Sequence, residues 1–424
     1  MTTEFCDFGV RTRVTRLKAI LVRLVALFTV GSSLMGLSIA QDLPCAIGPL
    51  PTGDPQYPQQ IVQVCIPPIG WNHQLVIYAH GFVAPQAPLA LPADELAIIG
   101  GNSTLAALLQ SGFAFATTSF RKNGYVVEQA TQDINQLLGY FNTLVAPGSL
   151  QKTYLVGGSD GGLIATKLIE EFSQSYDGAL SLCAPMGGAP YQTKYLGDFR
   201  VVFDYFFPSV FRDEFKAFEV PELAYLNWDT SGGYAQQVAA ALALNTSAAS
   251  QLFKVTRVAL NSQDLSGSAV QAALSLLFYS IWETPDLLAT AGGIPYDNRL
   301  TLYLGSNNDF ALNRRVERVA SDADARSYMR QFYQPSGQLH RPLVSLHTAF
   351  DPLVPFNHEL IYLGLTTLAG QRKNLTILPT ASYGHCNFQP AEVLGAFGLL
   401  VSQSNGQLSP ALRSLVSSAP KALH

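Results

Sequence analysis

Positive charge is scarce in this sequence and is nowhere concentrated. Of the 424 residues only 13% are charged, the formal net charge is −4, and no long run of Lys and Arg occurs. Nucleic-acid binding requires a concentrated basic surface that neutralises phosphates, so we expect no nucleic-acid partner. Because 48% of the residues are hydrophobic, the chain can bury a substantial core, which excludes a disordered or fibrous protein.

The sequence also lacks an internal repeat, a cluster of metal-ligating residues and a glycine-rich nucleotide-binding loop. Metals and phosphates require ligands at fixed positions, so their sites leave recognisable spacings in a sequence. We therefore expect no metal site and no cofactor. The oligomeric state stays open.

No uninterrupted apolar run reaches the ~20 residues that a bilayer-spanning helix needs. The run from Leu24 to Leu37 lies behind several basic residues and ahead of Ser38-Ile39-Ala40. The basic residues are Arg11, Arg13, Arg16, Lys18 and Arg23. This order predicts a secretory signal peptide over residues 1–40, cleaved after Ala40, and the alternative is a membrane anchor. We expect a secreted or periplasmic protein with no stable membrane span after cleavage.

Cysteines are few, and their number becomes even once the signal peptide is removed. Cleavage takes away Cys6 and leaves Cys45, Cys65, Cys183 and Cys386. Thiols tend to pair in an oxidising compartment, so two disulfides are expected. Cys45 and Cys65 flank a stretch rich in proline and glycine and could staple this N-terminal arm. Four cysteines allow three connectivities, which the spacing leaves open.

Short apolar segments alternate with segments of helical pattern in two parts of the chain, 41–189 and 342–424. After an early edge strand near 61–68, strands are expected at 75–79, 113–120, 153–157, 178–185, 342–348 and 374–380. Helices are expected at 103–111, 130–144, 162–173, 357–368 and from Pro390 onward. This alternation predicts an α/β fold with a mostly parallel sheet covered on both faces.

The alternation stops over residues 190–341, where the sequence is aromatic and helical in pattern. An insertion of this length between two strands of one sheet is commonly functional. We interpret it as a helical lid, and the alternative is a separate structural domain.

One serine lies at the point where a predicted strand meets a predicted helix. Gly157-Gly158-Ser159-Asp160-Gly161 matches G-x-S-x-G in the strand–turn–helix context that gives this motif its meaning. A serine on such a sharp turn has strained backbone angles, and the glycines let neighbouring chain approach closely. Ser159 is therefore the predicted nucleophile, with the backbone NH of Asp160 as an oxyanion donor. The alternative is an ordinary glycine-rich turn.

With these residues the chain resembles the α/β-hydrolase superfamily, over Val62 to Leu400 apart from the insertion. The resemblance implies an eight-stranded, mostly parallel sheet and the chain order Ser, acid, His. His80-Gly81-Phe82 follows a strand, and the superfamily places an HG dipeptide there. The backbone NH near Phe82 would be the second oxyanion donor. His80 is interpreted as a structural loop residue, with a catalytic role as the alternative.

The resemblance also assigns the acid and the base. Asp351 in LHTAFDPLVP follows the penultimate strand, and His385 in ASYGHCNF follows the last strand. Asp351 would fix the tautomer of His385, which would take the proton of Ser159. Alternatives are a turn-capping role for Asp351 and Asp160 as the acid. His347 and His358 are interpreted as packing or capping residues.

Cys386 directly follows His385, and Cys183 ends the strand after the serine turn. Pairing of these two cysteines would hold the histidine loop over the site. This is similar to tannase and feruloyl esterase relatives, in which the partner cysteine adjoins the serine. Gly158 occupies that place here, so the likeness to that subfamily is loose. The alternative is two buried free thiols.

The resemblance implies a secreted serine esterase that cleaves small or polymeric carboxylic esters through an acyl-enzyme. Aromatic residues of the insertion are candidates for binding an apolar or aromatic acyl group, although such residues are often simply core. They are Phe206, Phe207, Trp228, Tyr279 and Trp282. Two alternatives stay open: a serine peptidase of the same fold that anchors a peptide terminus through Asp204 or Glu283, and a non-catalytic binding protein. A dehalogenase would require Asp in place of Ser159.

Overall fold

The computed structural model describes residues 44–91 and 101–404, together with residues 410 and 413. The predicted signal peptide, its cleavage point and Cys6 lie outside the described residues.

The described residues form one sheet of eight strands in the order β1-β2-β4-β3-β5-β6-β7-β8. The strands are β1 (Cys45–Pro51), β2 (Gln59–Cys65), β3 (Gln74–Ala79), β4 (Ala114–Thr118), β5 (Lys152–Gly158), β6 (Gly178–Leu182), β7 (Leu343–Phe350) and β8 (Leu375–Tyr383). β2 is antiparallel to both of its neighbours, and β3 to β8 are parallel. The predicted fold class, a mostly parallel α/β sheet, is confirmed.

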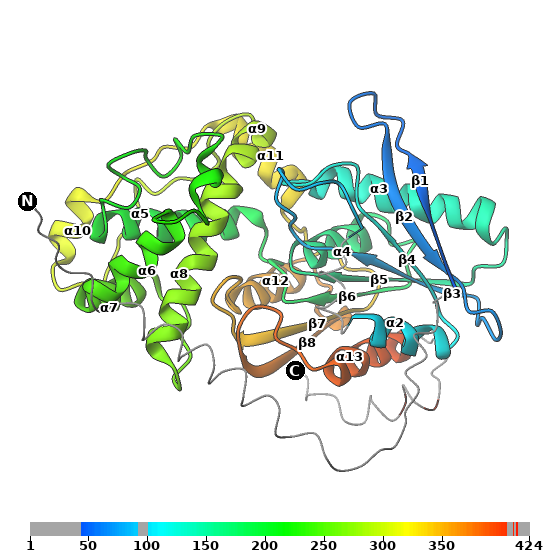
Figure 1. Ribbon diagram of the computed structural model, residues 1–424. Helices are drawn as coiled ribbons and strands as arrows, with labels where there is room; N and C mark the ends of the chain where they lie inside the picture. The colour runs from blue at the N-terminus through cyan, green and yellow to red at the C-terminus, as the bar shows by residue number, and fades with distance from the viewer. Residues whose placement is uncertain (1–43, 92–100, 405–409, 411–412, 414–424) are drawn as a thin grey trace, which may run out of the picture. The chain divides into compact units, whose positions relative to one another are not determined.

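Helices cover both faces of the sheet, as Figure 1 shows. One face packs against α2 (Gly101–Gln110) and α13 (Pro390–Gln403), and the other against α3 (Val127–Tyr140), α4 (Asp160–Glu171) and α12 (Asn357–Leu368). Strands covered on both faces are mostly apolar, and every residue of β3, β4 and β6 is buried. This burial makes the sheet a rigid base for the loops at its carboxyl edge.

The N-terminal edge of the sheet differs from the prediction. The stretch that follows Cys45 forms the edge strand β1, and β2 lies inside it rather than at the edge. Proline is tolerated in a strand only where no neighbour needs its NH, as at a sheet edge, which explains why Pro49 and Pro51 are accommodated in β1. The disulfide between Cys45 and Cys65 joins β1 to β2 in register.

The strand after the serine turn is shorter than predicted. β6 ends at Leu182, because Cys183 has φ of 46°. This left-handed conformation is incompatible with an extended strand. The chain therefore turns away from the sheet three residues earlier than its apolar pattern indicates.

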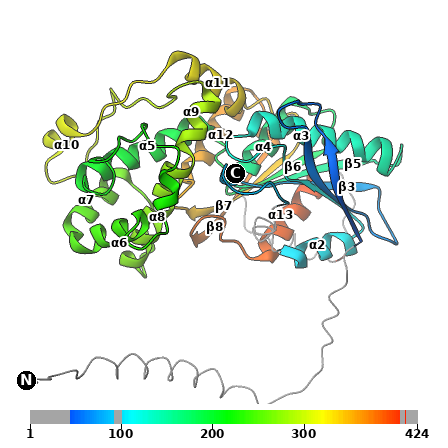
Figure 2. The same cartoon turned by 45° about the horizontal axis from the view of Figure 1, so that its top comes forward.

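Between β6 and β7 the chain forms a helical insertion, drawn from green to yellow in Figures 1 and 2. Its helices are α5 (Ala189–Phe206), α6 (Tyr234–Leu244), α7 (Thr246–Thr256), α8 (Leu265–Trp282), α9 (Thr284–Ala291), α10 (Asp309–Arg315) and α11 (Ala323–Tyr333). The insertion has a hydrophobic core of its own, built mainly from α5 to α8. α11 also contacts α3 of the sheet layer. A role as a lid stays a prediction.

Among the described helices, α8 is long and apolar enough to cross a membrane by length and composition alone. Its side chains Ala272, Leu276 and Ile281 are buried in the core of the insertion. Core helices of soluble proteins pass the same test, so this feature is weak support for a membrane span.

Candidate active site

Ser159 lies on a strained turn between β5 and α4. Its φ of 54° and ψ of −126° fall where non-glycine residues are rare, at a cost of about 1–3 kcal/mol. The backbone NH of Ser159 donates to the carbonyl of Leu182 at 2.9 Å, which ties the turn to the end of β6. The surrounding sheet thus maintains the strain and presents the hydroxyl at its carboxyl edge.

Two glycines make this turn possible through close packing. A Cβ atom at Gly157 would overlap the carbonyl of Gly161, and one at Gly161 would overlap the carbonyl of Ala79. Any side chain at Gly161 would therefore push α4 away from β3. The glycine pattern around Ser159 reflects this contact between helix and strand.

The three residues predicted to act together meet at the carboxyl edge of the sheet. Nε2 of His385 lies 2.9 Å from Oγ of Ser159, and Nδ1 of His385 lies 2.7 Å from Oδ2 of Asp351. Ser159 follows β5, Asp351 follows β7 and His385 follows β8. The histidine can therefore accept the serine proton on one nitrogen while the other donates to the carboxylate.

Asp351 is held as a buried carboxylate. Its Oδ1 accepts backbone hydrogen bonds from Leu353 at 2.8 Å and Val354 at 2.9 Å. Burial raises the pKa of Asp351, but the neighbouring imidazole of His385 and the backbone NH of Val354 lower it, and the net shift is downward. Thr348 donates to the carbonyl of Gly384 at 2.7 Å and so ties the acid strand to the histidine loop.

The other two histidines near the site are buried and hydrogen-bonded within the fold. Nδ1 of His358 accepts from the NH of Gly187 at 3.0 Å, and its Nε2 lies 2.8 Å from Oε1 of Gln192. Burial and the nearby His347 lower the pKa of His358 to about 3, so this imidazole is neutral. His347 lies within β7 and bonds to Glu359.

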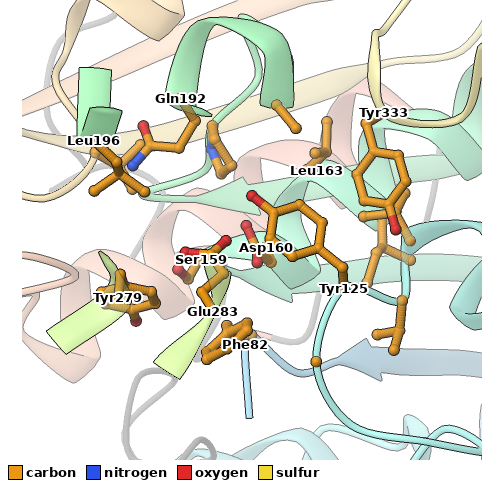
Figure 3. A pocket seen from close by; sticks show the side chains of 18 of the residues that line it. Phe82, Tyr125, Ser159, Asp160, Leu163, Gln192, Leu196, Tyr279, Glu283 and Tyr333 are labelled. Atoms are coloured by element: carbon orange, nitrogen blue, oxygen red, sulfur yellow. The ribbon is translucent and has the colours of Figure 1, made fainter. Parts of the chain in front are cut away.

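The two predicted oxyanion donors border the same pocket as Ser159. Phe82 and Asp160 both line it, and Figure 3 shows Asp160 directly beside the serine and Phe82 below it. No described residue accepts a hydrogen bond from the backbone NH of Phe82. His80 stacks on Phe120 with ring centroids 4.0 Å apart and donates from Nδ1 to the carbonyl of Gly81 at 2.7 Å. Burial lowers its pKa to about 4, consistent with a structural role.

The pocket lies where the insertion meets the carboxyl edge of the sheet. Apolar side chains form most of its wall: Val126, Val127, Leu163, Ile164, Leu196, Leu353 and Val354. Tyr125, Tyr279, Glu283 and Tyr333 add polar groups (Figure 3). Burial, the charge of Asp160 and the charge of Asp286 raise the pKa of Glu283 well above its usual value.

Of the five aromatic residues suggested for substrate binding, only Tyr279 lines this pocket. Phe207 and Trp228 are buried in the core of the insertion. Trp282 stacks on Phe278 outside the pocket lining, and Phe206 borders a separate surface hollow. Aromatic residues at helical spacing indicate buried positions. In this insertion most of them belong to its own hydrophobic core.

Tyr125 lines the pocket and was not predicted from the sequence, whereas Glu283 is one of the two acids considered above as an anchor. Tyr125 lies in the loop after β4, at the carboxyl edge where parallel sheets bind ligands. Its position in the chain could therefore have identified it as a candidate binding residue. Glu283 is an acid directly after the apolar helix α8. The other acid considered as an anchor, Asp204, instead pairs with Arg200 at 3.0 Å inside the insertion.

A disulfide joins Cys183 to Cys386 across 203 residues of sequence. Sγ of Cys386 lies 3.5 Å from Nε2 of His385, so the bridge borders the histidine directly. Within the described part of the chain, Cys183, His385 and Cys386 are also close enough together to bind a metal ion. A disulfide offers no thiolate, which is the form of cysteine that ligates metals, so this group does not fit a metal site.

No protein-family model matches the chain, and no curated protein matches it in sequence. Among solved structures, an esterase from Pyrococcus furiosus is 12% identical, with a TM-score of 0.44 over 86% of this chain and 92% of its own. Lipase A from Candida antarctica is 13% identical, with a TM-score of 0.42 over 89% and 78%. An acylaminoacyl peptidase from Pyrococcus horikoshii is 11% identical, with a TM-score of 0.41 over 86% of this chain and 42% of its own.

Proposed function

From the α/β-hydrolase fold of this chain, we propose that it is a hydrolase that cleaves carboxylic esters through an acyl-enzyme on Ser159. The observation that carries the proposal is the line of two short hydrogen bonds from Ser159 through His385 to Asp351. Nucleophile, base and orienting acid in this order are the elements of acyl transfer by a serine.

The geometry supports a two-step reaction. His385 takes the proton from Oγ of Ser159 as the oxygen attacks the ester carbonyl, and Asp351 stabilises the imidazolium that forms. The negative oxygen is received by the backbone NH groups of Phe82 and Asp160. His385 then gives its proton to the departing alcohol. A water molecule, deprotonated by the same imidazole, releases the acid and regenerates Ser159.

Two hollows border the triad, one lined by Ser159 and the other by His385, and together they suggest how an ester is oriented. The pocket beside Ser159 has a mainly apolar wall but a volume of only about 30 Å³, so it suits an acyl group once the insertion has moved outward. His385 borders a second, open hollow, whose described walls carry amide and hydroxyl side chains such as Asn261, Gln271 and Ser382, and no Lys, Arg, Asp or Glu. Because His385 protonates the leaving group, this hollow suits an uncharged polar alcohol, whether small or part of a polymer.

We further propose that the protein is secreted and that the insertion serves as its lid. The predicted signal peptide over residues 1–40 and the two disulfides support export. Contacts from α5 to the acid loop support the lid. Tyr195 donates to the carbonyl of Pro352 at 2.6 Å, and Gln192 donates to the carbonyl of Leu353 at 2.9 Å. A movement of α5 would therefore displace the loop that carries Asp351.

The proposal is tested by replacing the nucleophile. Ser159→Ala is expected to lower kcat on p-nitrophenyl esters by about 10³-fold or more. Ser402→Ala, at an exposed position of α13, is the matched control and should retain full activity. A fluorophosphonate should add its mass to wild-type Ser159 and not to the variant. Unchanged hydrolysis by Ser159→Ala would refute the mechanism.

A peptidase is the second candidate, and Glu283 is the observation that favours it. This carboxyl is 6% exposed and lines the same pocket as Ser159. No Lys, Arg or His among the described residues forms a salt bridge with it. A buried carboxylate without a cationic partner is costly, and burial accordingly raises the pKa of Glu283. The ammonium group of a substrate would supply the missing cation.

Matched substrates separate the two candidates. p-Nitrophenyl 4-methylpentanoate, its 2-amino derivative and the corresponding leucine anilide differ only in the amino group or the bond cleaved. A peptidase should prefer the amino compounds and lose this preference in Glu283→Gln. An esterase should cleave the plain ester best and the anilide slowly.

A further inference from the structure

We propose that His347 and Glu359 form a positioning pair behind Asp351, in which a doubly hydrogen-bonded imidazolium orients the acid and sets the pH range over which His385 acts as a base. This inference rests on the proposed function of Ser159, His385 and Asp351. Neither residue touches the reacting atoms, so both would act through Asp351.

The pair is fully buried and closely bonded. Nδ1 of His347 lies 2.8 Å from Oε1 of Glu359, and its Nε2 lies 2.9 Å from the carbonyl oxygen of Val354. The hydroxyl of Ser345 donates to the same Oε1 at 2.6 Å. Both side chains are inaccessible to solvent. Glu359 of α12 and Val354 in the loop after β7 thus fix the imidazole in a single orientation.

The partners of His347 determine its protonation. The carbonyl of Val354 can only accept a hydrogen bond, so Nε2 carries a proton. We assign a second ring proton to Nδ1, which faces Oε1 of Glu359, the oxygen that also accepts from Ser345. The other oxygen of Glu359, Oε2, is buried without a hydrogen-bond partner among the described residues. Burial alone would lower the pKa of His347, but Glu359 and Asp351 raise it above its usual value. The hydrogen-bond geometry and the neighbouring charges therefore both favour the imidazolium form of His347.

This imidazolium reaches Asp351 in two ways. Its Nε2 lies 3.8 Å from Oδ2 of Asp351, the oxygen that also faces His385. It also binds the carbonyl of Val354, whose NH donates to Oδ1 of Asp351 at 2.9 Å. His347 thus holds the loop that carries the acid and places a positive charge beside the carboxylate.

Other titratable groups face this cluster from every element packed around it. They are His358 and Tyr362 of α12, Tyr195 of α5, Tyr383 of β8 and His385. His358 is neutral because burial lowers its pKa to about 3. Burial likewise raises the pKa of each tyrosine, so these hydroxyls stay neutral. The charged groups that act on Asp351 are therefore His385 and His347, and Glu359 acts through His347.

The sign of the effect follows from these charges. The positive charge of His347 offsets part of the negative charge of Asp351 that attracts a proton to His385. Without it, the protonated form of His385, which cannot act as a base, persists to higher pH. Glu359→Gln removes the anion that keeps His347 protonated. It therefore also removes the positive charge beside Asp351, and both changes act in the same direction.

The test is the pH profile of kcat/KM on a p-nitrophenyl ester. In His347→Gln and in Glu359→Gln, the acidic limb is expected to move to higher pH by about one unit. The double variant should move it no further, because the two residues act as one unit. His358→Gln is the matched control: it replaces a buried but uncharged histidine next to Glu359 and should leave the position of the limb unchanged.

An equal loss of activity at every pH, with the limb in place, would show a merely structural role and overturn the proposal. Should the variants fail to fold by circular dichroism, the ¹⁵N chemical shifts of the imidazole of His347 in the wild-type protein decide instead. Two protonated ring nitrogens at pH 7 are expected, and a neutral ring would refute the inference. Failure of the proposed function is distinguishable, because Ser159→Ala would then leave hydrolysis unchanged.

Discussion

Cys183 and Cys386, 203 residues apart in the sequence, are joined by a disulfide that attaches the residue after His385 to the residue after β6. The serine turn is tied to the same point, because the NH of Ser159 binds the carbonyl of Leu182. The disulfide and this hydrogen bond therefore attach the loop of His385 and the turn of Ser159 to the same point, the carboxyl end of β6.

Removal of this bridge is expected to impair catalysis as well as folding, because the bridge closes a loop of 203 residues. In the double variant Cys183→Ala/Cys386→Ala the loop of His385 loses its anchor, and a displacement of about 1 Å would lower kcat by about 10²-fold. Steady-state kinetics on a p-nitrophenyl ester measures the change. The second bridge is the control: Cys45→Ala/Cys65→Ala, between β1 and β2, should lower the melting temperature and preserve kcat. Equal kcat values in the two double variants would contradict this prediction.

Replacement of the acid by its amide is expected to trap the wrong tautomer of His385. In Asp351→Asn, Oδ1 can still accept from Leu353 and Val354, so the amide NH₂ faces Nδ1 of His385. That nitrogen must then accept, and Nε2 carries the proton and cannot take one from Ser159. We expect kcat to fall by about 10⁴-fold with an unchanged circular dichroism spectrum. A loss of less than tenfold would argue against Asp351 as the acid.

Close packing beneath the serine turn predicts a strong effect of a single methyl group. Gly161→Ala places its Cβ on the carbonyl of Ala79, and overpacking of this kind costs about 1–3 kcal/mol. Chemical denaturation should show the loss, together with lower activity as α4 shifts. Gly139→Ala in α3 is the control, because open space surrounds this glycine. Alanine there should be neutral or stabilising by up to about 1 kcal/mol.

The buried His80 predicts a loss of stability in mild acid. Burial lowers its pKa from 6.5 to about 4, so between these values the unfolded chain binds a proton that the folded chain does not. Stability is therefore complete above pH 6.5 and is lost as the pH falls toward 4, by about 3 kcal/mol.

Urea unfolding at several pH values measures the effect of His80. In His80→Asn the amide can replace the hydrogen bond from Nδ1 to the carbonyl of Gly81, and the pH dependence between 6.5 and 4 should weaken. An unchanged slope would show that other groups cause the acid sensitivity.

Local signals in the sequence were enough to predict the layers of the fold and the residues of the triad. Apolar runs of strand length separated by helical patterns report burial on both faces of a parallel sheet, and these strands are present in the structure. The glycines beside Ser159 report a strained turn, since only they permit its contacts with neighbouring chain. The structure brings Ser159, His385 and Asp351 within hydrogen-bonding distance, and their catalytic roles stay a prediction.

Tertiary structure alone decided which side chains form the pocket and which stand behind the triad. The aromatic residues of the insertion could be core or binding site, because both uses produce the same helical spacing; packing placed Phe207 and Trp228 in the core and Tyr279 at the pocket. His347 and Glu359 are buried polar residues whose meaning depends on partners from separate elements. A sequence records that such a residue is present, but only the fold determines which charge it faces.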